Sequence, residues 1–253
     1  MTALKQVDLV KHLNQYLQVE RFDDRSLNGL QIEGPDKVSK ISFAVDFCGQ
    51  TAEAAARAGS QWLVVHHGWL WGPAAPLGGA QLRWVRMLLE ARVGLYAAHL
   101  PLDAHPVVGN NAALARLLGL QKVRPFGRYR QTAIGCRGEF KRAQRFSRIV
   151  ETLDKRLETR CSVFDFGKDS VRTVGIVSGA AANLIPEAIG EGLDLFITGE
   201  SSHTYYHPAR DAGQNAIFAG HYATETLGLK ELAKHLKKQF GVGVHWIDCP
   251  TGL

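Results

Sequence analysis

The chain has 253 residues, of which 45% are hydrophobic and 21% charged, and its net charge is +6. This length is enough for one large domain or two small ones with a substantial core. No apolar run approaches the roughly 18 residues that a membrane span needs, which argues against a membrane protein. The four cysteines are scattered and form no Cys-x-x-Cys pair, so reduced thiols in a cytoplasmic protein are favoured over a disulfide framework or a thiolate zinc site.

The first half of the chain alternates short apolar runs with helical patterns, which predicts βαβ units and mainly parallel sheets. The expected elements are a helix at 4–17, a strand at 41–45, a helix at 50–58, strands at 62–65 and 95–98, and a helix at 111–118. Gly59 is expected to end the second of these helices, because glycine readily takes the left-handed backbone conformation found there.

The second half repeats this order. Strands are expected at 171–177, 195–198 and 216–219, with helices at 182–190 and 223–239 and a last strand at 244–248. In each half the third strand is followed by a histidine, His99 or His221, and then by a helix. We interpret the repetition as an internal duplication that gives two similar α/β halves.

A basic segment separates the two halves. Residues 121–160 hold twelve Lys or Arg side chains against four acids. Such a concentration of charge either attracts phosphates or nucleic acid, or is the solvated face of a helix and loop. A pair of strands, at 132–135 and 162–166, is expected here, with a helix at 143–157 between them. The predicted domains are therefore a first α/β half at 1–120, a basic bridging segment at 121–170 and a second α/β half at 171–253.

Metal-type ligands follow three of the expected strands. The motifs are His66-His67-Gly68, His99-Leu-Pro-Leu-Asp103-Ala-His105 and Gly220-His221-Tyr-Ala-Thr-Glu225. The carboxyl ends of strands are where α/β sheets place their ligand sites. Imidazole nitrogen and carboxylate oxygen without thiolate suit zinc, iron or manganese.

Each motif also has an ordinary structural interpretation. His221 and Glu225 are four apart on one helix face, but a glutamate is favoured by the helix dipole there in any case. Adjacent histidines on a strand face opposite sides, so His66 and His67 can serve one site only if the strand has ended, as Gly68 suggests. Prolines on either side of Asp103 predict a rigid loop without helix. The conjunction of three motifs favours a metal site.

These three motifs, together with others along the chain, make it resemble a known family. Those that carry the resemblance are Asn28-Gly-Leu-Gln-Ile-Glu-Gly34, Val64-Val-His-His-Gly68, His99-Leu-Pro-Leu-Asp-Ala-His105, Gly109-Asn-Asn111, Ile197-Thr-Gly-Glu200 and Ala219-Gly-His-Tyr-Ala-Thr-Glu225. They are similar, in the same order, to the dinuclear metal-centre family, whose bacterial members are labelled GTP cyclohydrolase 1 type 2 homologues. The resemblance implies two interlinked α/β domains, a toroidal homohexamer and a site for two divalent metal ions.

The resemblance also implies the ligands of that site. They are His66, His67, Asp103, His221 and Glu225, with Glu225 bridging the two ions. Five ligands for two metals leave coordination positions open, as a reactive site requires. Candidates for orienting these ligands or moving protons are His99 and Glu200, with His105 and Asn111 as further possibilities.

Three functions agree with such a site. The first is a metal-dependent hydrolase acting on a nucleotide-like or other phosphate-bearing small molecule. The second is a protein that stores, delivers or inserts metal without turnover of its own. The third is a nucleic-acid-associated scaffold, which would use the basic segment. The sequence favours the hydrolase narrowly and does not identify the substrate.

Overall fold

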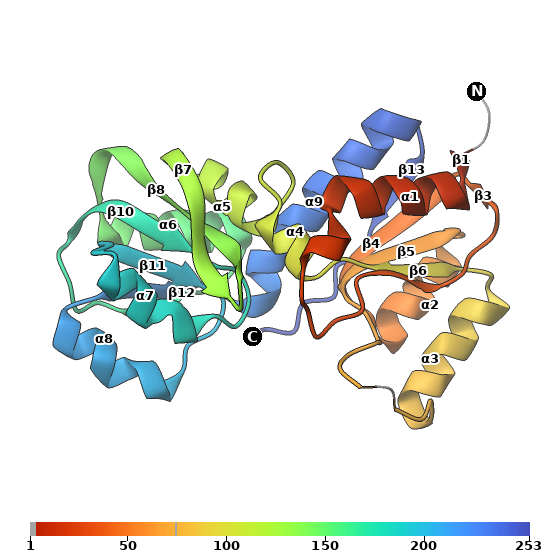
Figure 1. The fold of residues 1–253 in the computed structure, drawn as a ribbon, viewed down its shortest axis with the longest axis horizontal. Coiled ribbons are helices and arrows are strands. Elements are labelled where there is room, and N and C mark those ends of the chain that lie inside the picture. Colours follow the sequence, from red (N-terminus) through yellow and green to blue (C-terminus); the bar gives the residue numbers. More distant parts are fainter. Residues whose placement is uncertain (1–3, 74) are drawn as a thin grey trace. The chain divides into compact units, whose positions relative to one another are not determined.

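The computed structural model describes residues 4–73 and 75–253, and the chain divides into two compact units. The first unit comprises Met1–Leu102 with Leu229–Cys249, and the second comprises Asp103–Gly228 with Pro250–Leu253. Each unit is built on one main sheet flanked by helices, and the central strands of both sheets run parallel (Figure 1). The predicted α/β class with mainly parallel sheets is therefore confirmed. No helix within the described residues is long and apolar enough to cross a membrane.

The first unit contains a five-stranded sheet in the order β13-β4-β5-β6-β2. Its strands are β2 (Gly29–Ile32), β4 (Lys40–Asp46), β5 (Trp62–His67), β6 (Gly94–Ala97) and β13 (Gly243–Trp246). Strands β13, β4, β5 and β6 are parallel, while β2 pairs antiparallel with β6 at one edge. Two short strands, β1 (Leu4–Lys5) and β3 (Lys37–Val38), form a separate antiparallel pair.

Helices cover both faces of this sheet. On one face, α2 (Gly49–Arg57) and α3 (Gly79–Glu90) bury alanine, valine and leucine side chains against β4, β5 and β6 (Figure 1). On the other face lies α1 (Gln6–Leu17), which is followed by a 3-10 turn, η1 (Val19–Arg21). Trp62, Leu63, Val64 and Val65 are all fully buried, because β5 is central and covered on both faces.

The second unit contains a six-stranded sheet in the order β7-β8-β10-β11-β12-β9. Its strands are β7 (Gln121–Tyr129), β8 (Thr132–Arg145), β9 (Ser162–Phe164), β10 (Ser170–Ile176), β11 (Leu195–Thr198) and β12 (Asn215–Phe218). The central strands β10, β11 and β12 are parallel, and the outer pairings are antiparallel.

Helices cover both faces of this sheet as well. On one face, α5 (Asn110–Leu118) and α6 (Phe146–Leu157) share a core with alternate residues of β10, β11 and β12. On the other lie α7 (Ile185–Gly190) and α8 (Tyr206–Ala212), with the 3-10 turns η2 (Ala182–Leu184) and η3 (His203–Tyr205) preceding them (Figure 1). The chain passes between the units within two further helices, α4 (Leu100–Ala104) and α9 (His221–Phe240).

The two units repeat one order of elements around their parallel strands. In the first, β4, α2, β5, α3 and β6 follow one another; in the second, the order is β10, α7, β11, α8 and β12. Gly59, which was expected to end the first helix of this order, has a φ angle of +63°, and its counterpart in the second unit, Gly192, has +64°. In both repeats the third strand leads to the helix that carries candidate ligands, α4 or α9.

The basic segment is part of the second unit's sheet. Strands β7 and β8 form its edge hairpin, and β8 pairs with β10. The predicted pairing of the strands at 132–135 and 162–166 is wrong, because β9 pairs with β12 at the opposite edge of the sheet from β8. The last strand, β13, pairs with β4 and so belongs to the first unit. The units thus divide the chain elsewhere than at the predicted boundaries of 120 and 170.

Candidate metal centre

His66 and His67 form the end of β5, at the carboxyl edge of the first unit's parallel strands. The strand was expected to end before them, but pairing continues: the carbonyl oxygen of His67 accepts the backbone N–H of Phe47 at 2.8 Å. The expected strand end is therefore wrong. The two rings nevertheless lie together, with their centroids 4.7 Å apart.

Groups on the two flanking strands hold these rings. His66 Nδ1 lies 2.7 Å from the carbonyl oxygen of Ala98, just after β6, and His67 Nδ1 lies 2.8 Å from Oδ1 of Asp46, the last residue of β4. A carbonyl oxygen and a carboxylate can only accept, so Nδ1 is the donor in both rings. In the neutral imidazole, Nε2 then carries the lone pair, which is the arrangement that a metal ligand needs.

His99 joins these two histidines. Ligand nitrogens of His66, His67 and His99 all lie within 4.8 Å of one another, a spacing that suits a metal ion. His99 Nδ1 is 3.0 Å from both carboxylate oxygens of Asp24. Trp71 also packs here, since its ring makes an edge contact with His99 at a centroid distance of 4.9 Å and its indole N–H donates to the Gly68 carbonyl.

Asp24 is held as an anion behind His99. Burial of its carboxyl opposes ionisation, but hydrogen bonding and charge from His99, together with donors from Asn28 and the Ser26 backbone, outweigh it and lower the pKa of Asp24 to about 2. The backbone N–H of Leu100 also donates to this carboxylate, at 3.2 Å. Asp24 therefore fixes both the orientation of His99 and the start of α4.

Asp103 lies on α4 in the second unit, where the flanking prolines predict a rigid loop. That expectation is wrong, because Pro101 occupies the first turn of a helix, where a missing N–H removes no intrahelical hydrogen bond. Oδ1 of Asp103 accepts the side-chain amide of Asn110 at 2.9 Å and the Ser178 hydroxyl at 2.8 Å. Both donors are buried, so they hold this carboxylate in one orientation.

Asn111 locks the same region together. Its side-chain N–H groups donate to the carbonyl oxygens of Asp103 and Ile134, and its Oδ1 accepts the backbone N–H of Ser178 at 2.7 Å.

His105 has a different role. Its Nδ1 accepts the backbone N–H groups of Val107 and Val108, each at 3.1 Å, and so stabilises the turn after α4.

His221 and Glu225 lie one turn apart at the start of α9. His221 Nε2 is 3.2 Å from Oε1 of Glu225, and its Nδ1 is 2.5 Å from Oε1 of Glu200. Glu225 is buried, whereas Glu200 is partly exposed. Burial alone would lower the pKa of His221, but the hydrogen bond and charge of Glu225, followed by those of Glu200, raise it to about 9.

A glycine turn after β10 makes room for these side chains. A Cβ atom on Gly179 would overlap Oε1 of Glu225 and lie 3.3 Å from Nε2 of His221. Gly179 also has a φ angle of +67°, which other residues rarely adopt. Its backbone N–H donates to the Thr224 hydroxyl oxygen, which ties the turn to α9. No larger side chain fits at this position.

Each unit thus assembles its own set of predicted residues. The first brings together His66, His67 and His99; the second joins His221 to Glu225 and Glu200 and fixes Asp103 through Ser178. These imidazole nitrogens and carboxylate oxygens fit a divalent transition metal. The carboxylates that hold His67 and His99 were not among the predicted site residues. Asp46 is the last residue of a strand, so a search for acids at strand ends could have found it. Asp24 adjoins no element that is recognisable in the sequence, so the same search would have missed it.

The sequence matches the model of the Duf34/NIF3 (NGG1p interacting factor 3) family over residues 4–251. Two proteins called GTP cyclohydrolase 1 type 2 homolog, from Deinococcus radiodurans and Pyrococcus abyssi, are each 42% identical to this chain. The first alignment covers 97% of this chain and 94% of the relative, and the second covers 99% and 100%.

Solved structures agree with these matches. TTHA1606 from Thermus thermophilus is similar with a TM-score of 0.92 at 39% identity, and protein ybgI, of unknown function, with 0.91 at 33%. Each comparison covers 98% of this chain and the whole of the other. Full-length similarity in sequence and fold confirms the predicted resemblance, and the chain belongs to the Duf34/NIF3 family.

Proposed function

We propose that this protein holds two divalent ions, of iron, zinc or manganese, through His66, His67, Asp103, His221 and Glu225. The observation that carries the proposal is the way in which the ligand histidines are held. Each of the three places Nδ1 against an acceptor, so Nε2 is the nitrogen that would coordinate, and in His221 that nitrogen faces the carboxylate of Glu225. Outer hydrogen bonds of this kind accompany metal-ligating histidines and set their orientation.

The reaction that we infer is metal-dependent hydrolysis of a nucleotide-like or other phosphate-bearing substrate. The name of the relatives, GTP cyclohydrolase 1 type 2 homolog, supports this class of chemistry. Two divalent ions would supply Lewis acidity toward a phosphoryl or carbonyl oxygen. Asp103 and Glu225 balance only half of the charge of two such ions, so the centre would remain attractive to anionic substrates.

Two residues outside the ligand set have roles in this proposal. His99 is the group that we assign to hold or transfer a proton, because its ring lies beside His66 and His67 and its Nδ1 is fixed by Asp24. Glu200 is a positioning residue, since it contacts the ring of His221 rather than a metal ligand atom.

The alternative is a protein that stores, delivers or inserts metal without turnover. The same open coordination positions would serve it, and the partial exposure of Glu200 beside His221 would leave a route for exchange. The two functions differ in what accompanies metal binding. A hydrolase retains its metal through many turnovers, whereas a delivery protein loses it to an acceptor.

Elemental analysis of the native protein, followed by a metabolite screen, tests the proposal. We expect two equivalents of divalent metal per chain, and at least one phosphate-bearing metabolite that wild type consumes and Glu225→Ala does not. Glu231→Ala is the matched control, because Glu231 lies on the same helix and pairs with Lys234 at the surface. Native protein with fewer than one equivalent contradicts the metal proposal. Full metal without consumption, but with transfer to a chelating acceptor, favours metal delivery.

The resemblance also implies self-association into a toroidal homohexamer. Light scattering coupled to size exclusion measures this directly. We expect a mass six times the 27.8 kDa of one chain, and a monomeric mass would contradict it.

A further inference from the structure

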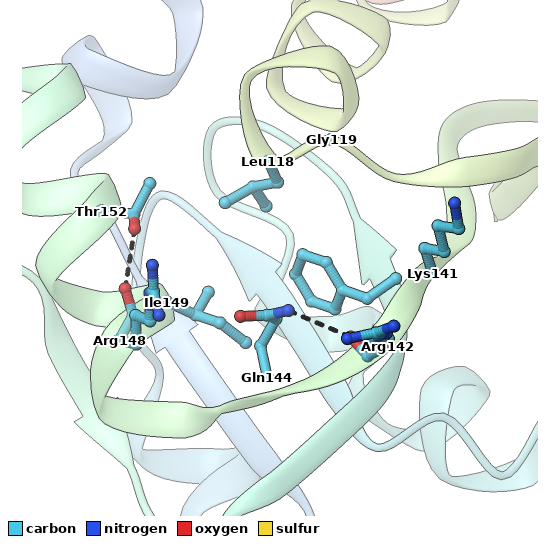
Figure 2. Close-up of a pocket in the computed structure, with 9 residues that line it drawn as sticks. Leu118, Gly119, Lys141, Arg142, Gln144, Arg148, Ile149 and Thr152 are labelled. Carbon is cyan, nitrogen blue, oxygen red and sulfur yellow. Dashed lines mark hydrogen bonds between the residues drawn. The ribbon is translucent and has the colours of Figure 1, made fainter.

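The second unit has a cleft that shares no residue with the proposed metal ligands. It lies between the end of β8 and the first turns of α6, and its volume is about 370 Å³. Figure 2 shows Arg148 of α6 on one side and Lys141 and Arg142 of β8 on the other, with Leu118 and Ile149 between them. Such a volume is at the lower end of the range for small-molecule sites.

The three cations at the rim are available to a ligand. Lys141, Arg142 and Arg148 are exposed, and within the part of the chain that the structure describes none of them forms an ion pair. Other cations of the same basic segment are neutralised: Lys122 pairs with Glu139 and Arg137 with Glu191. The positive charge of this segment is therefore uncompensated at the cleft.

The floor of the cleft is apolar and fixed. Phe140 and Ile149 are 6% and 3% exposed and belong to the core of the second unit, while Leu118 ends α5 beside them. The two neutral polar side chains already donate within the chain, Gln144 to the Arg142 carbonyl and Thr152 to the Arg148 carbonyl (Figure 2). The strongest donors left for a ligand are thus guanidinium and ammonium groups.

We propose that this cleft binds a small organic phosphate of the nucleoside monophosphate class. Arginine forks and a lysine ammonium suit a phosphate group, and Leu118, Phe140 and Ile149 offer an apolar surface to its ring or other hydrophobic part. A solvated basic face would need no such floor. A nucleic acid would need a longer basic track with exposed aromatic rings, which the cleft lacks.

Isothermal titration calorimetry of the full-length protein as purified tests the proposal. The probes are AMP, adenosine, inorganic phosphate and a single-stranded oligonucleotide. We expect AMP to bind more tightly than phosphate or adenosine, and Arg148→Glu to weaken its binding at least tenfold. Lys155→Glu is the matched control, because Lys155 is an exposed cation on the same helix outside the cleft, and it should change affinity less than twofold.

Two further variants separate this cleft from other anion sites. Leu118→Ala should weaken AMP binding severalfold and leave phosphate binding unchanged, whereas Glu225→Gln should leave the AMP affinity of the cleft intact. The proposal is overturned if Arg148→Glu and Lys155→Glu weaken binding equally, since a general electrostatic field would explain that result. It is also overturned if phosphate binds as tightly as AMP, or if only the oligonucleotide binds.

Discussion

The two units carry chemically different candidate ligands for the proposed metal ions. The first unit offers imidazoles at the ends of parallel strands, with Asp24 and Asp46 placed behind the rings on their Nδ1 side. The second unit offers carboxylates directly, with Asp103 on α4 and Glu225 on α9. Carboxylates of the first unit thus only orient histidines, whereas in the second unit Glu200 orients His221, and Asp103 and Glu225 are the proposed ligands.

This difference has a consequence for protons. In the second unit, His221 lies between two carboxylates, which raise its pKa to about 9 against the effect of burial. In the first unit, His66 and His67 each have one hydrogen-bond acceptor at Nδ1, a backbone carbonyl and the Asp46 carboxylate respectively. A metal ion must therefore displace a proton from the second unit's histidine.

The largest effect should come from removing charge in the second unit. Glu225→Gln keeps the size of the side chain but loses its negative charge, so we expect the divalent-metal affinity to fall by roughly 100-fold. His67→Gln removes a neutral donor from the first unit and should cost roughly tenfold. Metal content by elemental analysis after dialysis against a series of buffered metal concentrations measures both, with Glu231→Gln as the control on α9. Equal losses of metal affinity in the two variants would contradict the proposed difference between the units.

Proton competition should make metal binding depend on pH. Because His221 has a pKa of about 9 in the metal-free protein, we expect metal affinity to rise by up to about tenfold per pH unit from pH 6.5 to 9 and then to level off. Glu200→Gln removes one carboxylate from this ring, so the rise should level off at a lower pH. Competition titrations with a chelator of known affinity measure the profile.

The stability of the metal-free protein should depend on pH in the opposite direction to its metal affinity. A raised pKa means that the stabilisation from charged His221 is complete below about pH 6.5, its unperturbed value, and is lost as pH rises through about 9. The thermal midpoint of the chelator-treated protein should therefore fall over this range, by less in Glu200→Gln. A midpoint that rises with pH in both proteins would contradict the assignment of a charged His221.

Local patterns were sufficient to predict the central elements of both units. Apolar runs bounded by glycine place β4, β5, β10 and β11 within two residues of their observed ends. Pairing between strands distant in sequence was not predictable in this way. The apolar pattern of β13 does not reveal that its partner is β4, about 200 residues earlier, and nothing in β9 distinguishes pairing with β12 from pairing with β8.

The same contrast between local patterns and distant contacts applies to the candidate ligands. A histidine or acid directly after a buried strand can be found from sequence, because strand ends gather at one edge of a sheet. Asp24 and Ser178 could not be found, since their importance depends on which side chain the fold brings to them. Pro101 was misleading because the same residue favours a loop or the first turn of a helix, and only the burial of Leu102 and Asp103 on α4 decides between them.

A smaller effect is expected from the first unit's outer carboxylate. Asp24→Asn keeps an acceptor for His99 but loses its charge, so metal content should stay unchanged while any hydrolytic activity falls about tenfold. The free energy of unfolding should fall by about 1–3 kcal/mol at pH 7. Because the pKa of Asp24 is lowered to about 2, this difference should persist above pH 4 and vanish as pH falls through 2. Urea unfolding at several pH values checks it, with exposed Asp36→Asn as the control.

The smallest effect should come from His105, the histidine that the sequence placed among the candidates and the structure assigns to a turn. His105→Ala removes the acceptor of two backbone N–H groups, so we expect the free energy of unfolding to fall by about 1 kcal/mol. His105→Asn should recover part of that loss, because a side-chain carbonyl can accept from the same turn. Metal content should be unchanged in both variants. A loss of metal from His105→Asn would instead indicate that His105 is a metal ligand in the second unit. In that case, carboxylate ligands would no longer distinguish the second unit from the first.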